Sequence, residues 1–400
     1  MNEEHDAGTL PSESSTSTAP ACVHQGAVMN PSPESAAAER QFVRSAITQL
    51  NPYHPVEAAE TLAQQLGMPL GQILKLDSNE NPYGPSLHAL EALSTFNYYH
   101  WYPDSEATSA RRRIASYAGT SPARILLTNG SDEMIDLLYL TTLDPGDEVI
   151  IPTPSFGVYR ARAELYGGVA VSVPRTETWD LDMPAILAAI TPRTKLIIVN
   201  SPNNPTGNLA SNSQIATLLQ TGVLVVVDEA YFEFAQRSAL PLASEFDNLV
   251  VLRTFSKWSG LAGLRLGYAI LPPSIIEHIW KVKAPFNVNQ AALAAVEASL
   301  DDVEFLMNNV NRLRAERTRL RRQLDTLSMF ETFPSDANYI FCRVTRGDAA
   351  DIHQRLADRG IMVRKYGGDL RDYIRISIGR PEDTQRLMGA LRTIGSTINA

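Results

Sequence analysis

Cysteine and histidine are scarce in this chain of 400 residues. The two cysteines, Cys22 and Cys342, lie far apart, which excludes a disulfide framework or a cysteine zinc site and favours a reducing compartment, the cytoplasm. The seven histidines form no pair with ligand spacing, so we expect no metal centre. Aliphatic runs such as Val223–Val227 are far too short to cross a bilayer.

Positive charge is also limited, because 35 Lys and Arg residues face 44 Asp and Glu residues and the formal net charge is −9. Such an acidic chain is a poor candidate for binding nucleic acid or an anionic membrane through its overall charge. We therefore expect neither nucleic acid nor a membrane as its partner.

The first 38 residues contain no Lys or Arg, five acidic residues and many Ser, Thr, Pro and Ala. They show no apolar periodicity, so we predict a disordered tail over residues 1–38. The segment lacks the basic start and apolar stretch of a secretory signal and the arginines of a transit peptide.

From Glu39 onward, β-branched runs alternate with amphipathic stretches of helical length. This alternation predicts an α/β protein with a mostly parallel sheet that is covered by helices. The expected strands are Ile125–Thr128, Glu148–Ile151, Val169–Val173, Leu196–Asn200, Val223–Asp228 and Leu249–Thr254, and the expected helices are Asp132–Thr142, Phe156–Tyr166, Pro184–Ile190 and Asn212–Gln220. After Pro285, a long helix over Asp301–Leu327 and segments at Ala337–Val344, Asp348–Arg359 and Tyr373–Ile378 predict a smaller α+β domain.

Four of the expected strands end in unusual polar clusters, and ligands of open parallel sheets bind outside these carboxyl ends. One cluster ends in Lys257, which is one of only six lysines and precedes a glycine-rich turn. An amine held among apolar and cationic neighbours has a lowered pKa and can form a Schiff base. Considered alone, Lys257 is better explained as a solvated lysine at a strand end.

Asp228 follows the apolar run Val223–Val227, so its carboxylate should emerge from a buried strand and needs a cationic partner. The protonated ring nitrogen of a pyridine cofactor would serve as this partner. The simple alternative is that Asp228 caps the following helix. Tyr231 lies one turn further and could bind a phenolate oxygen of the cofactor. Phe156 follows another strand and is placed to stack on an aromatic ring, although a core position explains it as well.

A phosphate group would fit the start of the helix that follows Thr128. Ser131 and Asp132 lie at this predicted helix start, where backbone N–H groups attract anions, although a helix cap without ligand explains them individually. Ser256 and Arg265 flank Lys257 and could complete the phosphate site. The sequence contains no P-loop, no nucleophile elbow and no dinucleotide-binding glycine pattern.

These residues occur in a recognisable order. The elements Asn204-Pro-Thr-Gly207, Asp228-x-x-Tyr231, Ser256-Lys257 and Arg265 resemble those of fold-type I pyridoxal-phosphate (PLP) aminotransferases. Further segments are similar to those of the histidinol-phosphate aminotransferases: Ser78–Pro85, Tyr102–Asp104, Asn129–Glu133, Asp228–Phe234, Lys283–Asn289, Pro334–Asn338 and Ile374–Gly379. The resemblance covers the chain from about Leu50 to its C-terminus.

The resemblance implies a fold-type I PLP-transferase fold and a PLP cofactor that is bound covalently by Lys257. It implies that Asp228 pairs with the ring nitrogen and that Asn204 and Tyr231 hold the phenolate oxygen. The phosphate would be held by Ser131, Ser256, Arg265 and, from the other subunit of a homodimer, Tyr102. Arg375, with Arg364 as its helper, would bind the anionic end of the substrate, and Tyr83 would line the substrate pocket. Ser105, the short loop Lys365–Asp372 and Arg380 depart from the family pattern on the substrate side.

The implied domains are an N-terminal segment over 39–84 that packs with the small domain, a large PLP-binding domain over 85–288 and a small domain over 289–400. The implied reaction transfers an amino group between histidinol phosphate and 2-oxoglutarate. Two alternatives use the same scaffold, namely an aromatic amino-acid aminotransferase and a threonine-phosphate-type decarboxylase. A PLP-binding regulator without turnover is a remote alternative, because residues 1–38 contain no DNA-binding module.

Overall fold

The computed structural model describes residues 42–48 and 57–398. The chain divides into two units, residues 1–48 and 49–400, and in the first the structure describes the short helix α2 (Ser45–Thr48). The predicted disordered tail over residues 1–38 lies outside the described residues. The other described helices and strands belong to the second unit.

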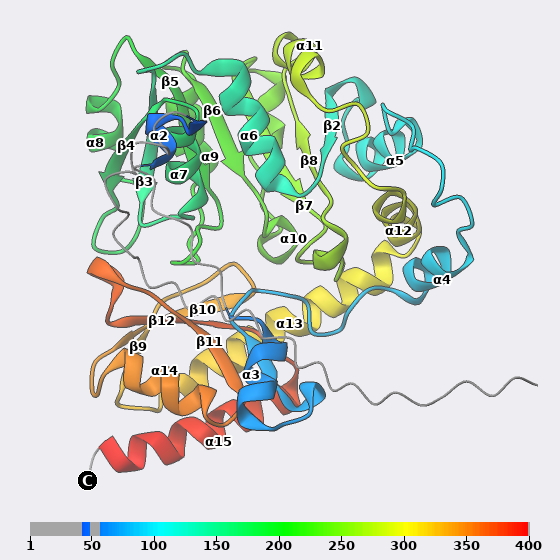
Figure 1. Cartoon of the computed structure of the whole chain (residues 1–400). Helices are drawn as coiled ribbons and strands as arrows, with labels where there is room; N and C mark the ends of the chain where they lie inside the picture. Colours follow the sequence, from blue (N-terminus) through cyan, green and yellow to red (C-terminus); the bar gives the residue numbers. More distant parts are fainter. Residues whose placement is uncertain (1–41, 49–56, 399–400) are drawn as a thin grey trace, which may run out of the picture. The chain divides into compact units, whose positions relative to one another are not determined.

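A seven-stranded sheet forms the larger layer of this unit, in the order β2-β8-β7-β6-β5-β3-β4 (Figure 1). Only β8 runs antiparallel to its neighbours, β2 and β7. The predicted mostly parallel sheet is thus confirmed. The strands are β2 (Ile125–Thr128), β3 (Glu148–Thr153), β4 (Val169–Pro174), β5 (Thr194–Asn200), β6 (Leu224–Asp228), β7 (Leu249–Thr254) and β8 (Gly267–Ile270).

Helices cover both faces of this sheet. Its strands are apolar on both faces and do not alternate between apolar and polar residues, so both faces have to be buried. In β6, Val225 and Val227 join one apolar cluster, whereas Val226 joins the cluster on the opposite face. The Val226 face is covered by α6 (Ser131–Thr142), α7 (Val158–Leu165) and α11 (Pro273–Val282). The other face is covered by α5 (Thr108–Ala118), α8 (Met183–Ala188), α9 (Asn212–Leu219), α10 (Phe232–Ala235) and α12 (Gln290–Asp301), with α4 (Leu87–Thr95) packed against α12.

A second sheet of five strands has the order β1-β11-β12-β10-β9. Its first strand comes from the N-terminal segment and pairs in parallel with β11, Leu74 opposite Ile361. The strands are β1 (Leu74–Leu76), β9 (Phe330–Thr332), β10 (Tyr339–Val344), β11 (Ile361–Lys365) and β12 (Tyr373–Ser377), and the remaining helices are α3 (Ala59–Leu66), α13 (Val303–Leu324), α14 (Ala349–Ala357) and α15 (Pro381–Ile398). The division into domains at 84/85 and 288/289 stays a prediction.

Four strands, β1, β8, β9 and β11, were not predicted. They are three to five residues long, and β8 begins with a glycine, so their local pattern is weak and pairing with neighbouring strands determines them. The predicted long helix over Asp301–Leu327 is α13, which begins at Val303 because Asp302 leaves helical geometry between α12 and α13.

The carboxyl ends of β2, β5, β6 and β7 meet at one edge of the large sheet. The antiparallel strand β8 separates β2 from β7, so these two strands point in the same direction. The four polar clusters that follow these strands are therefore brought together by the topology. Within the described ranges, no helix combines the length and apolar character needed to span a membrane.

Candidate active site

A cavity of about 450 Å³ lies at this edge of the large sheet. Its lining includes residues from β12 and from the segment after β1, so both sheets contribute to it. The predicted residues that line it are Ser131, Asp132, Phe156, Asn204, Asp228, Tyr231, Ser256, Lys257, Arg265, Arg364 and Arg375. Tyr83 and Tyr102 do not line it in the single chain.

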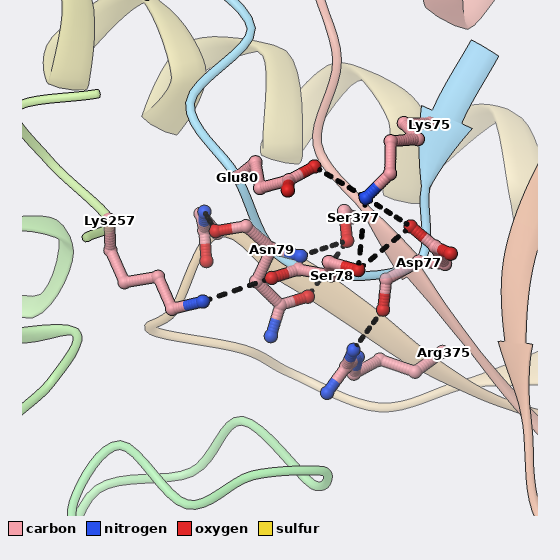
Figure 2. A network of polar contacts seen from close by, with 9 residues as sticks. Lys75, Asp77, Ser78, Asn79, Glu80, Lys257, Arg375 and Ser377 are labelled. Carbon is pink, nitrogen blue, oxygen red and sulfur yellow. Dashed lines mark hydrogen bonds and ion pairs between the residues drawn. The ribbon is translucent and has the colours of Figure 1, made fainter. Parts of the chain in front are cut away.

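Lys257 extends from the turn after β7 into this cavity. Its Nζ donates a hydrogen bond of 2.9 Å to the carbonyl oxygen of Ser78, as Figure 2 shows. Burial lowers the pKa of Lys257 to about 8, and the positive charge of Arg375 acts in the same direction. A considerable fraction of this amine is therefore neutral near physiological pH, which nucleophilic attack on an aldehyde requires.

The segment that accepts this hydrogen bond is itself held by ionic contacts (Figure 2). Lys75 of β1 donates to Glu80 at 2.9 Å and lies 3.6 Å from the carboxylate of Asp77. The carbonyl oxygen of Asp77 accepts a hydrogen bond from Arg375. The residues after β1 thus form one wall of the cavity, between Lys257 and Arg375.

Asp228 ends β6 and is buried, with 4% of its surface exposed. Its carboxylate accepts a hydrogen bond of 2.6 Å from the hydroxyl of Tyr159 and one of 3.0 Å from the backbone N–H of Ala230. Burial raises its pKa to about 6 in spite of these two hydrogen bonds. None of the cationic side chains that the structure describes forms an ion pair with Asp228, and a buried carboxylate in this state fits a protonated pyridine nitrogen.

Tyr231, Asn204 and Phe156 also line the cavity. The hydroxyl oxygen of Tyr231 accepts a 2.9 Å hydrogen bond from the side chain of Asn79. The side-chain oxygen of Asn204 accepts one of 2.6 Å from Arg375. Phe156 precedes α7, which begins at Val158 and not at Phe156 as predicted, and its ring packs edge-on against Tyr159.

A second group of residues surrounds the start of α6, which begins at Ser131. Arg265 lies 3.3 Å from the carboxylate of Asp132 and donates to the hydroxyl of Ser256 at 3.4 Å. The backbone approaches closely here, since a Cβ atom on Gly130 would lie 2.5 Å from the Arg265 guanidinium. A helix N-terminus, two hydroxyls and a guanidinium form an arrangement that suits a phosphate.

Arg375 and Arg364 lie opposite each other on the neighbouring strands β12 and β11. Arg375 is buried, contacts Asn204 and the Asp77 carbonyl, and lies 5.2 Å from the ring centre of Tyr339. Two guanidinium groups in one cavity can bind a carboxylate or a phosphate in bidentate geometry.

Tyr83 lies outside the cavity, between two other arginines. Its ring centre is 4.2 Å from the guanidinium carbon of Arg312 and 5.4 Å from that of Arg380. Arg380, one of the departures from the family pattern, also donates to the carbonyl oxygen of Pro82. The role of Tyr83 in the substrate pocket stays a prediction.

Tyr102 also lies away from the cavity and is 80% exposed. It stacks on Phe286 with the ring centres 4.6 Å apart and lines a separate groove of about 420 Å³ with Tyr99 and Trp101. The role of Tyr102 in the site of a second subunit stays a prediction.

Sequence reasoning missed residues that reach the cavity from elsewhere in the chain. Tyr159 lies one turn after Phe156, and this spacing on the predicted helix was its only signal. Asn79 lies within one of the segments that carry the resemblance but was not assigned a role. Tyr366 lines the cavity from the loop between Arg364 and Arg375.

Within residues 42–48 and 57–398, no three His, Cys, Asp or Glu side chains are arranged to hold a metal ion.

The sequence model of the family "Aminotransferase class I and II" matches residues 71–391. Histidinol-phosphate aminotransferase of Roseiflexus castenholzii is 44% identical over 363 residues, which cover 88% of this chain and 98% of that protein. The chloroplastic histidinol-phosphate aminotransferase of Nicotiana tabacum is 39% identical over 355 residues, which cover 88% of this chain and 86% of that protein.

A solved structure supports the same relationship. The histidinol-phosphate aminotransferase of Sinorhizobium meliloti in complex with pyridoxal-5'-phosphate has a TM-score of 0.81 and 27% sequence identity. The match covers 89% of this chain and 98% of that one. The chain therefore belongs to the class I and II aminotransferases and, within them, to the histidinol-phosphate aminotransferase family.

Proposed function

We propose that this PLP-dependent aminotransferase transfers the amino group between L-histidinol phosphate and 2-oxoglutarate. One observation carries the proposal: the amine of Lys257 and the buried carboxylate of Asp228, which has no cationic partner among the described residues, line the same cavity. When bound, PLP supplies an aldehyde and a ring that withdraws electrons from the α-carbon of the substrate.

The residues around the cavity divide into three groups by the part of the cofactor that they would hold. Ser131, Ser256 and Arg265 would hold the phosphate, and Asp132 would orient Arg265. Asp228 would hold the proton on the ring nitrogen, and Phe156 would cover the ring. Tyr231 and Asn204 would bind the phenolate oxygen.

Lys257 would also move the proton between the α-carbon of the substrate and the cofactor. Burial and the charge of Arg375 favour its neutral form, which can accept that proton at Nζ. The carbonyl oxygen of Ser78, 2.9 Å away, orients the amine.

Arg375 and Arg364 would bind the anionic end of each substrate. An aminotransferase accepts its two substrates in turn in one pocket, so this pocket has to bind a phosphate in one half-reaction and a carboxylate in the other. Guanidinium groups bind both in the same bidentate geometry.

A homodimer would complete the site with Tyr102 of the second subunit. Aromatic side chains gather on the surface of the single chain, and Tyr98, Tyr99, Trp101 and Phe286 are 47–61% exposed beside Tyr102. Such an aromatic surface is typical of protein interfaces. Light scattering should give the mass of a dimer, and Trp101→Glu should shift the measured mass towards that of the monomer.

We also propose a cytoplasmic location, which cell fractionation tests.

A panel of amino donors tests the reaction. The protein loaded with PLP is mixed with histidinol phosphate, phenylalanine or threonine phosphate, and the visible absorbance of the cofactor is followed. Histidinol phosphate should remove this absorbance fastest, and 2-oxoglutarate should restore it. Faster loss with phenylalanine would favour the aromatic aminotransferase, and carbon dioxide release from threonine phosphate would favour the decarboxylase. Absence of turnover with every donor would favour the regulator.

Lys257→Ala is the control for covalent binding. Borohydride should trap the cofactor on the unchanged protein and not on this variant. Trapping of equal amounts on both proteins would contradict the role of Lys257.

A further inference from the structure

Asn79 has an unusual backbone conformation in the wall of the cavity. Its φ angle is +55°, in the left-handed region that non-glycine residues seldom adopt, and only 1% of its surface is exposed. It lies on the segment between β1 and α4, directly after Ser78, whose carbonyl oxygen binds Lys257 (Figure 2). A strained, buried position of this kind persists only where several contacts hold it.

Four hydrogen bonds hold Asn79. Its backbone N–H donates to the hydroxyl of Ser377 at 2.9 Å, and its carbonyl oxygen accepts from Asn338 at 2.9 Å. In its side chain, Oδ1 accepts from the Ser377 hydroxyl at 2.8 Å and Nδ2 donates to the hydroxyl oxygen of Tyr231 at 2.9 Å. Ser377 belongs to β12, the strand that also carries Arg375.

The single proton of the Ser377 hydroxyl fixes the orientation of the Asn79 amide. The Ser377 oxygen accepts the backbone N–H, and its own proton goes to Oδ1. With the amide turned over, Ser377 would accept twice, and its proton would have no acceptor among the contacts of the described residues. Because Ser377 is 2% exposed, this loss would be costly.

The amide orientation in turn fixes the direction of the hydrogen bond at Tyr231. Nδ2 of Asn79 has only protons to offer, so the Tyr231 oxygen acts as an acceptor in this contact. The proton of the Tyr231 hydroxyl is therefore available for another acceptor. Tyr231 is buried and lines the cavity.

We propose that Asn79 is a positioning residue that acts through Tyr231: it occupies an acceptor site of the Tyr231 hydroxyl and leaves the proton of that hydroxyl for the phenolate oxygen of the bound cofactor. This inference rests on the proposed function. It links the strand that carries Arg375 with the electronic state of the cofactor, through Ser377 and Asn79.

The protonation state of Tyr231 agrees with a role as donor. Burial raises the pKa of Tyr231 to about 12, although the charge of Arg375 and the hydrogen bond from Asn79 lower it. Tyr231 therefore keeps its proton at physiological pH. The titratable and charged groups that interact with it are Arg375, Asp228, Tyr159, Tyr339 and Tyr366.

A double-mutant cycle on the PLP-loaded protein tests the proposal. The visible absorbance of the bound cofactor is titrated with acid and base in the unchanged protein, Asn79→Gly, Tyr231→Phe and the double variant. Glycine is chosen because it tolerates the positive φ angle. A donor stabilises the anionic phenolate oxygen, so its loss should raise the pH midpoint of the absorbance change.

We expect Tyr231→Phe to raise the midpoint by about one pH unit and Asn79→Gly by about half a unit. In the Tyr231→Phe background, Asn79→Gly should have no further effect. An equal shift in both backgrounds, or no shift in either, would overturn the proposal. Asn338→Ala removes another buried amide that contacts Asn79 but not Tyr231, and an equal shift in this control would also overturn it.

Ser377→Ala keeps the proposal testable if Asn79→Gly does not fold. This variant removes the group that orients the amide, so the midpoint should rise only in proteins that contain Tyr231. A rise that is also present with Tyr231→Phe would refute the mechanism. If the unchanged protein shows no visible absorbance with PLP, the proposed function itself fails, and not this inference alone.

Discussion

Tyr159→Phe removes one hydroxyl and leaves the buried ring in place. That hydroxyl donates the 2.6 Å hydrogen bond to Asp228, and both side chains are buried. A hydrogen bond to a charged group contributes about 1.5–3 kcal/mol, and one pKa unit corresponds to about 1.4 kcal/mol. The pKa of Asp228, which burial has already raised to about 6, should therefore rise further by about one to two units.

The direction of the pH dependence follows from the charge of the carboxylate. The ring nitrogen requires the anionic form of Asp228. This anion is present above the raised pKa of about 6 and is lost as the pH falls through it. In Tyr159→Phe this loss should occur at a higher pH. The affinity for PLP should then decrease about two- to tenfold relative to the unchanged protein near pH 7, and the difference should diminish at higher pH.

The measurement is the dissociation constant of PLP as a function of pH for both proteins. Lys257 and the phosphate group of PLP titrate in the same way in the two proteins, so their contributions cancel in the ratio of the two dissociation constants. Tyr139→Phe is the matched control, since Tyr139 is equally buried and its hydroxyl donates to the backbone carbonyl of Tyr159, 3.1 Å away. A ratio that is independent of pH, or the same loss in the control, would refute the reasoning.

Three further outcomes are expected. Capture of PLP by the protein without cofactor should accelerate as the pH rises, with a midpoint near pH 8, because the neutral amine of Lys257 reacts. Stopped-flow absorbance measures this rate, and a flat profile would contradict the lowered pKa. Gly130→Ala should weaken the binding of PLP, because the added Cβ would lie 2.5 Å from the guanidinium of Arg265. Pyridoxal, which lacks the phosphate, should be bound by this variant as by the unchanged protein, and an equal loss of affinity for both compounds would exclude the assigned phosphate site. Glu229→Gln should lower the free energy of unfolding by about 3–5 kcal/mol, because it removes the carboxylate that lies 3.0 Å from the buried guanidinium of Arg253. Denaturant titration measures this change, and a value below about 1 kcal/mol would argue against the prediction.

The sequence was sufficient for those parts of the site that depend on local order. Asp228 follows a run of valines, and Lys257 follows the next strand, so both could be assigned to strand ends from their neighbours alone. The carboxyl ends of parallel strands share one edge, and this rule is enough to place the two side chains in one cavity. The resemblance then supplied the cofactor.

Local order could not show the contacts that adjust these groups. Asn79 and Ser377 are 298 positions apart, Asn79 and Tyr231 are 152 apart, and Tyr159 and Asp228 are 69 apart. Hydrogen bonds extend only about 3 Å, so it is the packing of the helices and of the second sheet on the first that decides which distant side chains meet. For the same reason, the sequence alone determined which residues end the strands, whereas only the tertiary structure decided which hydroxyl and amide groups control their charge.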